Sequence, residues 1–358
     1  MTYAFAAAGT GGHVYPALAV ADALVRRGVR PDDVVFFGGD RMEASVVPEH
    51  GYSFVAVRIH GLRRALAADN LRLPSALWRA TRRIATELRQ RGTKVMTAFG
   101  GYVSVPAAWA AHRCGAQLFV HEQNAVPGMA NRIIAGRADA SFVAFAETGR
   151  KLRHARVVGN PLRPELAAFD RAALRPQACA RYQLGGERPV LGVLGGSLGA
   201  RVLNEVTARI ADAHDPDQID IVHLTGHAHH ESVAQRAALS EVRWCALPFE
   251  ERMDLFYAVS DVVLSRAGAL TISELAATGT PAVVVPLDSV SQRPNAATLE
   301  RVGGVVVVLE SDLDRVAVEL GQLLADEPRR AAMARAAASQ GRPEAADDMA
   351  VALLEAAG

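Results

Sequence analysis

The first residues whose types suit chemistry form a glycine turn that ends in a histidine. Gly9-Thr10-Gly11-Gly12-His13 follows an apolar run and precedes a helical pattern. Glycine permits positive φ and lets a ligand approach the backbone closely, and an imidazole beside such a turn can take a proton from a sugar hydroxyl near neutral pH. The turn is a candidate ligand contact and His13 a candidate general base; a tight turn with a structural histidine is the alternative.

A second glycine turn of this kind lies near the middle of the chain, at Gly195-Gly196-Ser197-Leu198-Gly199-Ala200. Its backbone amides, the Ser197 hydroxyl and the N-terminus of the following helix together suit a diphosphate. The turn lacks the Lys-Ser/Thr ending of a Walker A loop, and its spacing departs from GxGxxG. These departures disfavour a kinase, an ATPase and a dehydrogenase.

A third turn of small residues lies at 266–274, Arg-Ala-Gly-Ala-Leu-Thr-Ile-Ser-Glu. It precedes a helix, with the Glu274 carboxylate in the first or second helical turn. Such a carboxylate can accept both hydroxyls of a ribose, as acidic residues do in nucleotide-binding folds. A glutamate that is merely favoured by the helix dipole explains the same residue.

Short strands and longer helices alternate along the chain, as in a doubly wound parallel sheet. Strands are expected at 3–7, 34–37, 95–98, 117–121, 140–144, 156–158, 190–194, 219–224, 242–246, 262–265, 282–285 and 305–307, and helices at 16–27, 42–50, 200–214 and within 327–357. A strand, a glycine turn and a helix follow one another twice, which predicts an α/β fold with two Rossmann-like halves. The predicted domains are 1–162 and 163–339, and a C-terminal helix at 340–358 is expected to pack back on the first.

Composition narrows the class of protein. The chain has 358 residues, a formal net charge of +1 and three cysteines that are far apart. No global field attracts it to nucleic acid, so no nucleic-acid partner is expected, and the cysteines indicate a reducing compartment. The N-terminus is expected to be a buried strand and not a signal peptide. No apolar run is long enough to cross a membrane, so any membrane contact is expected to be peripheral.

Seven motifs resemble, in order and spacing, those of the MurG family of glycosyltransferases. They lie at 9–13, 100–104, 121–125, 159–163, 195–200, 266–274 and 292–296, and together span nearly the whole chain. The resemblance implies a GT-B fold, with two Rossmann-like domains facing an interdomain cleft. It also implies inverting transfer of N-acetylglucosamine (GlcNAc) from UDP-GlcNAc to the 4-hydroxyl of undecaprenyl-linked MurNAc-pentapeptide, the step from lipid I to lipid II in peptidoglycan synthesis. No cofactor is implied, and the chain shows no DxD-like pair near the diphosphate turns, so no metal is expected.

The positions that match the family motifs imply roles for individual residues. Donor contacts are expected from Thr10, Gly11, Gly12, Asn124, Arg163, Ser197, Ala269, Leu270, Thr271, Ile272, Ser273, Glu274 and Gln292; Gly196, Glu250, Asn295 and Tyr102 are further candidates for donor or acceptor contacts. His13 would be the base for the muramyl 4-hydroxyl, and Arg163 would stabilise the departing UDP. The chain departs from the family pattern at Ala8, Val105, Glu250 and Ser291, which leaves fine donor selectivity open.

The region from Arg58 to Lys94 is strongly basic. Ten Lys and Arg residues face only two acidic ones, and several leucines and Trp78 are interleaved with them. These residues could enter the interface of an anionic membrane, and the family resemblance implies that this is the cytoplasmic face of the bacterial plasma membrane. An ordinary solvated helix is the alternative.

Three rival functions remain open at this point. A UDP-GlcNAc 2-epimerase uses a similar pair of domains but needs no acceptor. Another lipid or natural-product glycosyltransferase would share the fold but not the motifs at 121–125 and 292–296. The third is a non-catalytic nucleotide-sugar-binding subunit, which the intact set of His13, Glu274 and Gln292 disfavours.

Overall fold

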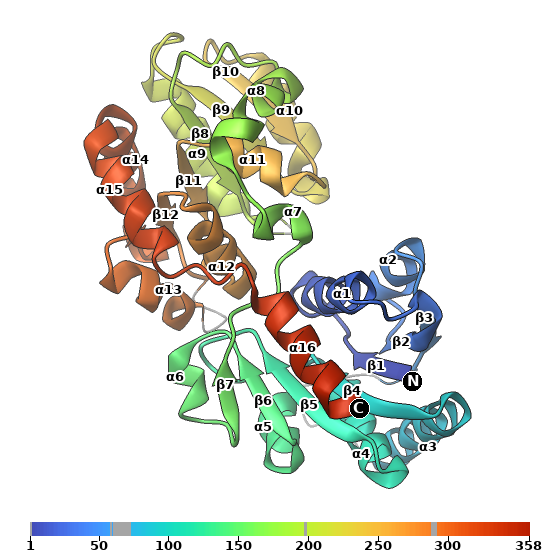
Figure 1. Ribbon diagram of the computed structural model, residues 1–358. Helices are drawn as coiled ribbons and strands as arrows, with labels where there is room; N and C mark the ends of the chain where they lie inside the picture. The colour runs from blue at the N-terminus through green and yellow to red at the C-terminus, as the bar shows by residue number, and fades with distance from the viewer. Residues whose placement is uncertain (1, 58, 60–72, 197–198, 288–291) are drawn as a thin grey trace. The chain divides into compact units, whose positions relative to one another are not determined.

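The computed structural model describes residues 2–57, 59, 73–196, 199–287 and 292–358. The chain forms two compact units: unit 1 comprises Met1–Arg163 and Pro343–Gly358, and unit 2 comprises Pro164–Arg342. Each unit contains one parallel sheet covered by helices (Figure 1). Among the described residues, none of the helices combines the length and the apolar character needed to cross a membrane.

Unit 1 is built on a seven-stranded parallel sheet in the order β3-β2-β1-β4-β5-β6-β7. The strands are β1 (Thr2–Ala6), β2 (Val34–Gly38), β3 (Ser53–Ala56), β4 (Thr93–Ala98), β5 (Gln117–Glu122), β6 (Ala140–Val143) and β7 (Ala155–Val157). In the central strand β1, Phe5 pairs with Phe36 of β2 and with Thr97 of β4. All five residues of β1 are buried, as expected for a strand with helices on both faces.

Helices cover both faces of this sheet. They are α1 (Gly11–Arg26), α2 (Glu43–Glu49), α3 (Leu73–Arg91), α4 (Ser104–Cys114), α5 (Met129–Ile134), α6 (Ala146–Gly149) and α16 (Ala345–Ala357). One core cluster joins Phe5 to Leu24 of α1 and Leu353 of α16. The helices α1 and α16 lie side by side (Figure 1). A second cluster joins Ala4 to Ile84 of α3, in keeping with the alternation of side chains along a strand.

Unit 2 has a six-stranded parallel sheet in the order β10-β9-β8-β11-β12-β13. The strands are β8 (Val190–Leu194), β9 (Asp220–Leu224), β10 (Arg243–Leu247), β11 (Val262–Ser265), β12 (Ala282–Val284) and β13 (Val305–Val307). The helices are α7 (Pro164–Ala167), α8 (Arg171–Tyr182), α9 (Arg201–Ala213), α10 (His230–Ala238), α11 (Met253–Val259), α12 (Ala269–Thr278), α13 (Arg293–Arg301), α14 (Asp314–Ala325) and α15 (Glu327–Ala338).

Two local expectations were wrong. The strand β3 at the edge of the unit 1 sheet was missed, because it is only four residues long and only Val55 in it is fully buried. The first helix was expected to begin at Pro16 but begins at Gly11. Proline favours the first helical position, yet Pro16 is here inside the helix, and His13 therefore lies in the first helical turn and not before it.

Candidate active site

The predicted motifs follow strands at the point where each sheet reverses its order. In unit 1, β1 lies between β2 and β4; in unit 2, β8 lies between β9 and β11. Parallel sheets bind ligands at the carboxyl ends of the strands on either side of such a reversal. Residues 9–13 follow β1, 100–104 follow β4, 195–200 follow β8 and 266–274 follow β11. Each unit therefore has two of the predicted motifs at its switch point.

The two ring nitrogens of His13 have different roles. Nδ1 lies 2.9 Å from the carbonyl oxygen of Ala8. A carbonyl can only accept, so the proton is assigned to Nδ1. The lone pair is then on Nε2, the nitrogen that faces Gly100. A general base needs an unprotonated nitrogen of this kind.

Gly100 keeps the space beside Nε2 of His13 open. Its φ is +102°, a conformation that side-chain-bearing residues rarely adopt, and a Cβ built there would lie 2.9 Å from both Cδ2 and Nε2 of His13. Any other residue at this position would push against the imidazole. A glycine is thus favoured both by the backbone conformation and by the close approach of the imidazole.

The surroundings of His13 favour its neutral form. Burial lowers the pKa of His13 below its ordinary value, and the hydrogen bond to Ala8 and the nearby carboxylates of Glu122 and Glu43 offset this only in part. The N-terminal end of α1 also disfavours a positive charge. The imidazole is therefore neutral at neutral pH, as a proton acceptor must be.

Glu43 is a functional candidate that the sequence did not indicate. It is fully buried at the start of α2, and its Oε1 accepts the backbone N–H groups of Gly9 at 3.3 Å and Gly39 at 2.9 Å. Among the described residues, its Oε2 has no hydrogen-bond partner. Glu43 thus fixes the first glycine turn. A single glutamate in an amphipathic helix pattern carries no signal that separates it from a surface residue.

Asn124 is held by a neighbouring buried carboxylate. The backbone N–H and the Nδ2 of Asn124 donate to Oε1 of Glu122 at 2.9 and 3.1 Å. The other oxygen of Glu122 accepts from the N–H of Gly128 and from Nδ2 of Asn131, both at 2.9 Å. The whole loop after β5 is therefore organised around Glu122, which the sequence analysis did not single out from its motif.

His121 illustrates a histidine with a purely structural role. It is fully buried, its Nε2 lies 3.0 Å from the carbonyl oxygen of Gly159, and burial lowers its pKa to about 4. Because the carbonyl only accepts, Nε2 carries the proton, and Nδ1 accepts from Gln123 at 3.2 Å. Both nitrogens are engaged inside the protein, in contrast with Nε2 of His13.

Tyr102 and Arg163 lie near the switch point of unit 1. The Tyr102 hydroxyl approaches Gly39, and its pKa is raised by burial and by the nearby carboxylates of Glu43 and Asp40. The Arg163 guanidinium lies over the ring of Tyr15, 5.0 Å from its centroid. This cation–π contact helps to fix the position of the guanidinium.

In unit 2, the predicted turn at 269–274 is helical. Gly268 is the N-cap, and α12 begins at Ala269, so Glu274 lies in the second turn. The side chain of Ile272 is buried, and its N–H donates to the Gly268 carbonyl oxygen at 2.9 Å. The start of this helix offers backbone groups and its dipole to an anion. Gly196 is exposed after β8, and Ser197 lies outside the described residues.

Glu274 receives a hydrogen bond from the core. The hydroxyl of Tyr257, a fully buried residue of α11, donates to Oε2 of Glu274 at 2.8 Å. This pair could not be predicted from sequence, because the two residues belong to different helices and meet only in the folded unit.

Gln292 and Asn295 fix the start of α13. Oε1 of Gln292, the N-cap residue, accepts the N–H of Leu287 at 3.0 Å. Nδ2 of the buried Asn295 donates to the carbonyl oxygen of Ala267 at 3.1 Å. The second contact ties α13 to the turn before α12, so the residues predicted from the motifs at 266–274 and 292–296 lie together in unit 2.

The Glu250 carboxylate is engaged within unit 2. Its two oxygens accept from Nε and Nη2 of Arg181 at 2.7 and 2.8 Å, from the Tyr182 hydroxyl at 3.0 Å and from the N–H of Arg252 at 2.8 Å. Burial raises the pKa of Glu250, but these hydrogen bonds outweigh burial and bring it below its ordinary value. The side chain is thus a structural anion, and a nucleotide contact at this position would come from the backbone.

Comparison with known proteins finds a matching family domain in each half of the chain. Residues 3–143 match the glycosyltransferase family 28 N-terminal domain, and residues 190–349 match the glycosyltransferase family 28 C-terminal domain. A UDP-N-acetylglucosamine–N-acetylmuramyl-(pentapeptide) pyrophosphoryl-undecaprenol N-acetylglucosamine transferase from Acidothermus cellulolyticus is 39% identical over 365 residues, covering 100% of this chain and 98% of the relative.

Solved structures agree with the sequence comparison. The crystal structure of Acinetobacter baumannii MurG has a TM-score of 0.77 and 26% identity, covering 99% of this chain and 100% of that one. A putative UDP-N-acetylglucosamine 2-epimerase from Listeria monocytogenes has a TM-score of 0.68 at 15% identity over 98% of this chain and 94% of its own, which shows the fold alone. The predicted GT-B class with two Rossmann-like domains is confirmed, and the chain belongs to the MurG family of glycosyltransferases.

Proposed function

We propose that this protein transfers GlcNAc from UDP-GlcNAc to the 4-hydroxyl of undecaprenyl-linked MurNAc-pentapeptide, with inversion at the anomeric carbon, in peptidoglycan synthesis. The observation that carries the proposal is the identity of 39% over the full chain with a transferase named for this reaction. A neutral His13 whose Nδ1 is held by the Ala8 carbonyl, which leaves the lone pair on Nε2, fits the chemistry that such a transfer requires.

The proton transfer is assigned to unit 1. In the proposed step, Nε2 of His13 takes the proton of the muramyl 4-hydroxyl as its oxygen attacks the anomeric carbon of GlcNAc. The bond from that carbon to the β-phosphate oxygen of UDP breaks on the opposite face, so the configuration inverts. Arg163 stabilises the negative charge that develops on the departing UDP. Tyr102 is proposed to contact the acceptor.

The donor contacts are assigned to the predicted residues of both units. In unit 2, Gly196, Ser197 and the start of α12 would hold the diphosphate, Glu274 would accept the ribose hydroxyls and Gln292 would orient the sugar. The remaining proposed donor contacts are Thr10, Gly11, Gly12 and Asn124 of unit 1, the helical residues Ala269, Leu270, Thr271, Ile272 and Ser273, and the backbone of Glu250.

The region 58–94 is proposed to bind peripherally to an anionic membrane at the cytoplasmic face. Of this region, residues 58 and 60–72 lie outside the described part. In α3, Ile84 and Leu88 face the core, whereas Trp78 is 51% exposed and the Arg82 guanidinium lies 4.7 Å from its ring centroid. An exposed tryptophan among arginines suits an interface with anionic head groups.

Vesicle binding tests this surface. The protein should sediment with vesicles rich in phosphatidylglycerol at low salt, and replacing Trp78 with Ala and Arg79, Arg82 and Arg83 with Gln should release it. A matched control replaces three exposed arginines of unit 2 with Gln, namely Arg201, Arg209 and Arg236, and should sediment as the wild type does. Equal release by both sets, or no sedimentation of the wild type, would exclude a specific surface on α3.

Acceptor dependence tests the reaction. Purified protein is incubated with UDP-GlcNAc, with and without a short-chain lipid I analogue, and UDP release is followed. We expect release only when the acceptor is present. Formation of UDP-ManNAc without acceptor would identify an epimerase. UDP release with a different lipid or small-molecule acceptor, but none with the lipid I analogue, would identify another glycosyltransferase.

A further inference from the structure

The carboxylate proposed to bind ribose is contacted by a buried phenol. Tyr257 lies in α11 and is fully buried, and its hydroxyl donates to Oε2 of Glu274 on α12 at 2.8 Å. Hydrogen bonds to an ionised acceptor are stronger than those between neutral groups. The orientation of Glu274 is therefore set from the core of unit 2.

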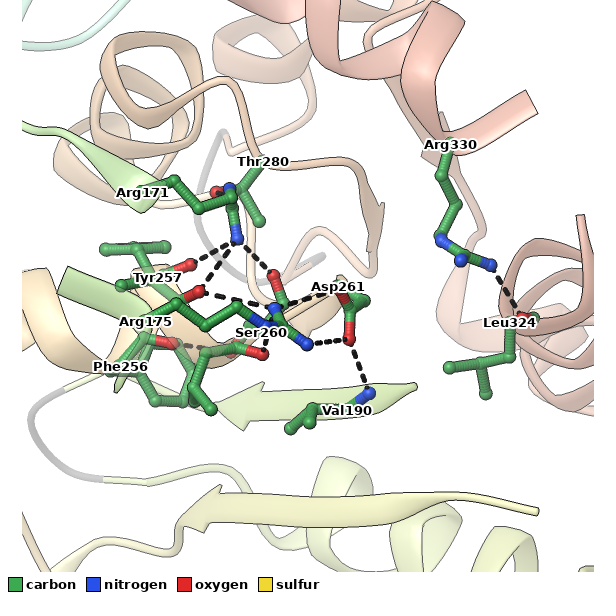
Figure 2. A network of polar contacts seen from close by, with 12 residues as sticks. Arg171, Arg175, Val190, Phe256, Tyr257, Ser260, Asp261, Thr280, Leu324 and Arg330 are labelled. Atoms are coloured by element: carbon green, nitrogen blue, oxygen red, sulfur yellow. Dashed lines mark hydrogen bonds and ion pairs between the residues drawn. The ribbon is translucent and has the colours of Figure 1, made fainter. Parts of the chain in front are cut away.

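Two arginines of α8 hold the end of α11, and with it the backbone of Tyr257 (Figure 2). The last carbonyl groups of a helix have no partner within it. Arg171 donates to the carbonyl oxygens of Tyr257 and Ser260, both at 2.7 Å, and Arg175 pairs with Asp261 at 3.0 Å. Cationic side chains at this end of a helix satisfy its carbonyls and its dipole.

Arg171 also connects to the end of α12. It donates to Oγ1 of Thr280 at 2.6 Å, and that oxygen lies 2.8 Å from Oγ1 of Thr278. Thr278 in turn donates to the carbonyl oxygen of Glu274 at 2.8 Å. Burial lowers the pKa of Arg171 to about 10, so the guanidinium remains charged at neutral pH. One cation therefore holds together the ends of the two helices that carry Tyr257 and Glu274.

We propose that Tyr257 is a positioning residue for the donor, which aligns the Glu274 carboxylate to accept the ribose hydroxyls. The inference rests on the proposed role of Glu274. A carboxylate offers about four lone-pair sites, one of which accepts from Tyr257. Because a glutamate side chain has several rotatable bonds, fixing it in advance reduces the ordering that binding would otherwise require.

The test compares Tyr257→Phe with the wild type, using UDP-GlcNAc and its 2′-deoxyribose analogue as donors. Loss of the hydroxyl should raise the KM for UDP-GlcNAc by about tenfold, with kcat within about twofold of the wild type. The preference for the ribose donor, measured as the ratio of the two kcat/KM values, should fall. In a Glu274→Gln background, adding Tyr257→Phe should change this ratio no further.

Tyr182→Phe is the matched control. Tyr182 is also a buried tyrosine of unit 2, and its hydroxyl donates to a carboxylate oxygen, Oε2 of Glu250, at 3.0 Å. The substitution again removes a tyrosine hydroxyl, but the carboxylate that it contacts is not the one proposed to bind ribose. This variant should be less stable in urea and should keep the wild-type preference for the ribose donor. Circular dichroism establishes that each variant is folded at the assay temperature.

The outcomes separate the inference from the proposed function. If folded Tyr257→Phe keeps the wild-type KM and ribose preference, or if Tyr182→Phe alters that preference as much, Tyr257 does not position Glu274. If Glu274→Gln itself keeps the full ribose preference, the ribose role of Glu274 is wrong, and the inference fails with it even where transfer to the lipid acceptor is intact.

Arg171→Lys loses the forked contact to both helices and should shift the KM in the same direction as Tyr257→Phe.

Discussion

Gly100→Ala should disable His13 while leaving the chain folded. The positive φ of +102° costs a side-chain-bearing residue on the order of 1–3 kcal/mol. The new Cβ would lie 2.9 Å from Nε2, where ordinary contacts begin near 3.4 Å, so the imidazole must move by several tenths of an ångström. Its 2.9 Å hydrogen bond to Ala8 then lengthens. A misplacement on the order of 1 Å at a catalytic group costs on the order of 100-fold in rate; the shift here is about half as large, so we expect kcat to fall by about tenfold.

Gly28→Ala is the control that separates the effect of the steric clash from the effect of backbone strain. Gly28 has a similar φ of +96° in the same unit, but a Cβ there meets nothing within 4 Å. Both variants should lose about 1–3 kcal/mol of unfolding free energy in urea, and only Gly100→Ala should lose kcat in the UDP-release assay with saturating donor and acceptor. The reasoning is refuted if Gly100→Ala keeps kcat within about twofold of the wild type, or if Gly28→Ala loses as much.

Three further predictions concern pH, stability and metals. Because the pKa of His13 lies below the ordinary value of 6.5, the acid limb of kcat/KM should have its half-maximal point below pH 6.5; a half-maximal point above 6.5 would contradict this. Glu250→Gln should cost about 2–4 kcal/mol in urea at neutral pH. Since the pKa of Glu250 is lowered, its stabilising contribution is present above the ordinary value of 4.5 and is lost as the pH falls below that value, so wild type and variant should converge in acid; a constant difference would refute the assignment. Excess EDTA should leave turnover unchanged, because Arg163 and the backbone amides supply the positive potential; loss of turnover that magnesium restores would overturn this.

The central strands could be predicted from the sequence because they are short apolar runs bounded by glycine turns. The expected central strands at 190–194 and 262–265, and the edge strand at 305–307, have the observed bounds. The edge strand β3 lacked that signal, since only one of its four residues is buried. The start of α1 was misplaced because Pro16 resembles a first helical residue, whereas Gly11 and Gly12 adopt the helix before it.

The candidate site was predictable where chemistry is carried by contiguous motifs, and not where it depends on tertiary contacts. His13 and Glu274 stand out through their place in glycine-containing turns. Glu43 does not, because its role depends on reaching amides at residues 9 and 39 from another element. Tyr257 meets Glu274 across two helices, a contact that periodicity cannot reveal. The engagement of Glu250 with Arg181 likewise required the folded unit.

The proposed transfer reaction is tested by the structure of its product. The protein is incubated with UDP-GlcNAc and a short-chain lipid I analogue, and the lipid product is isolated and examined by mass spectrometry and NMR. We expect one added N-acetylhexosamine, joined in the β configuration to the 4-oxygen of the muramyl residue. A product with an α linkage, a different attachment position or no added sugar would contradict it.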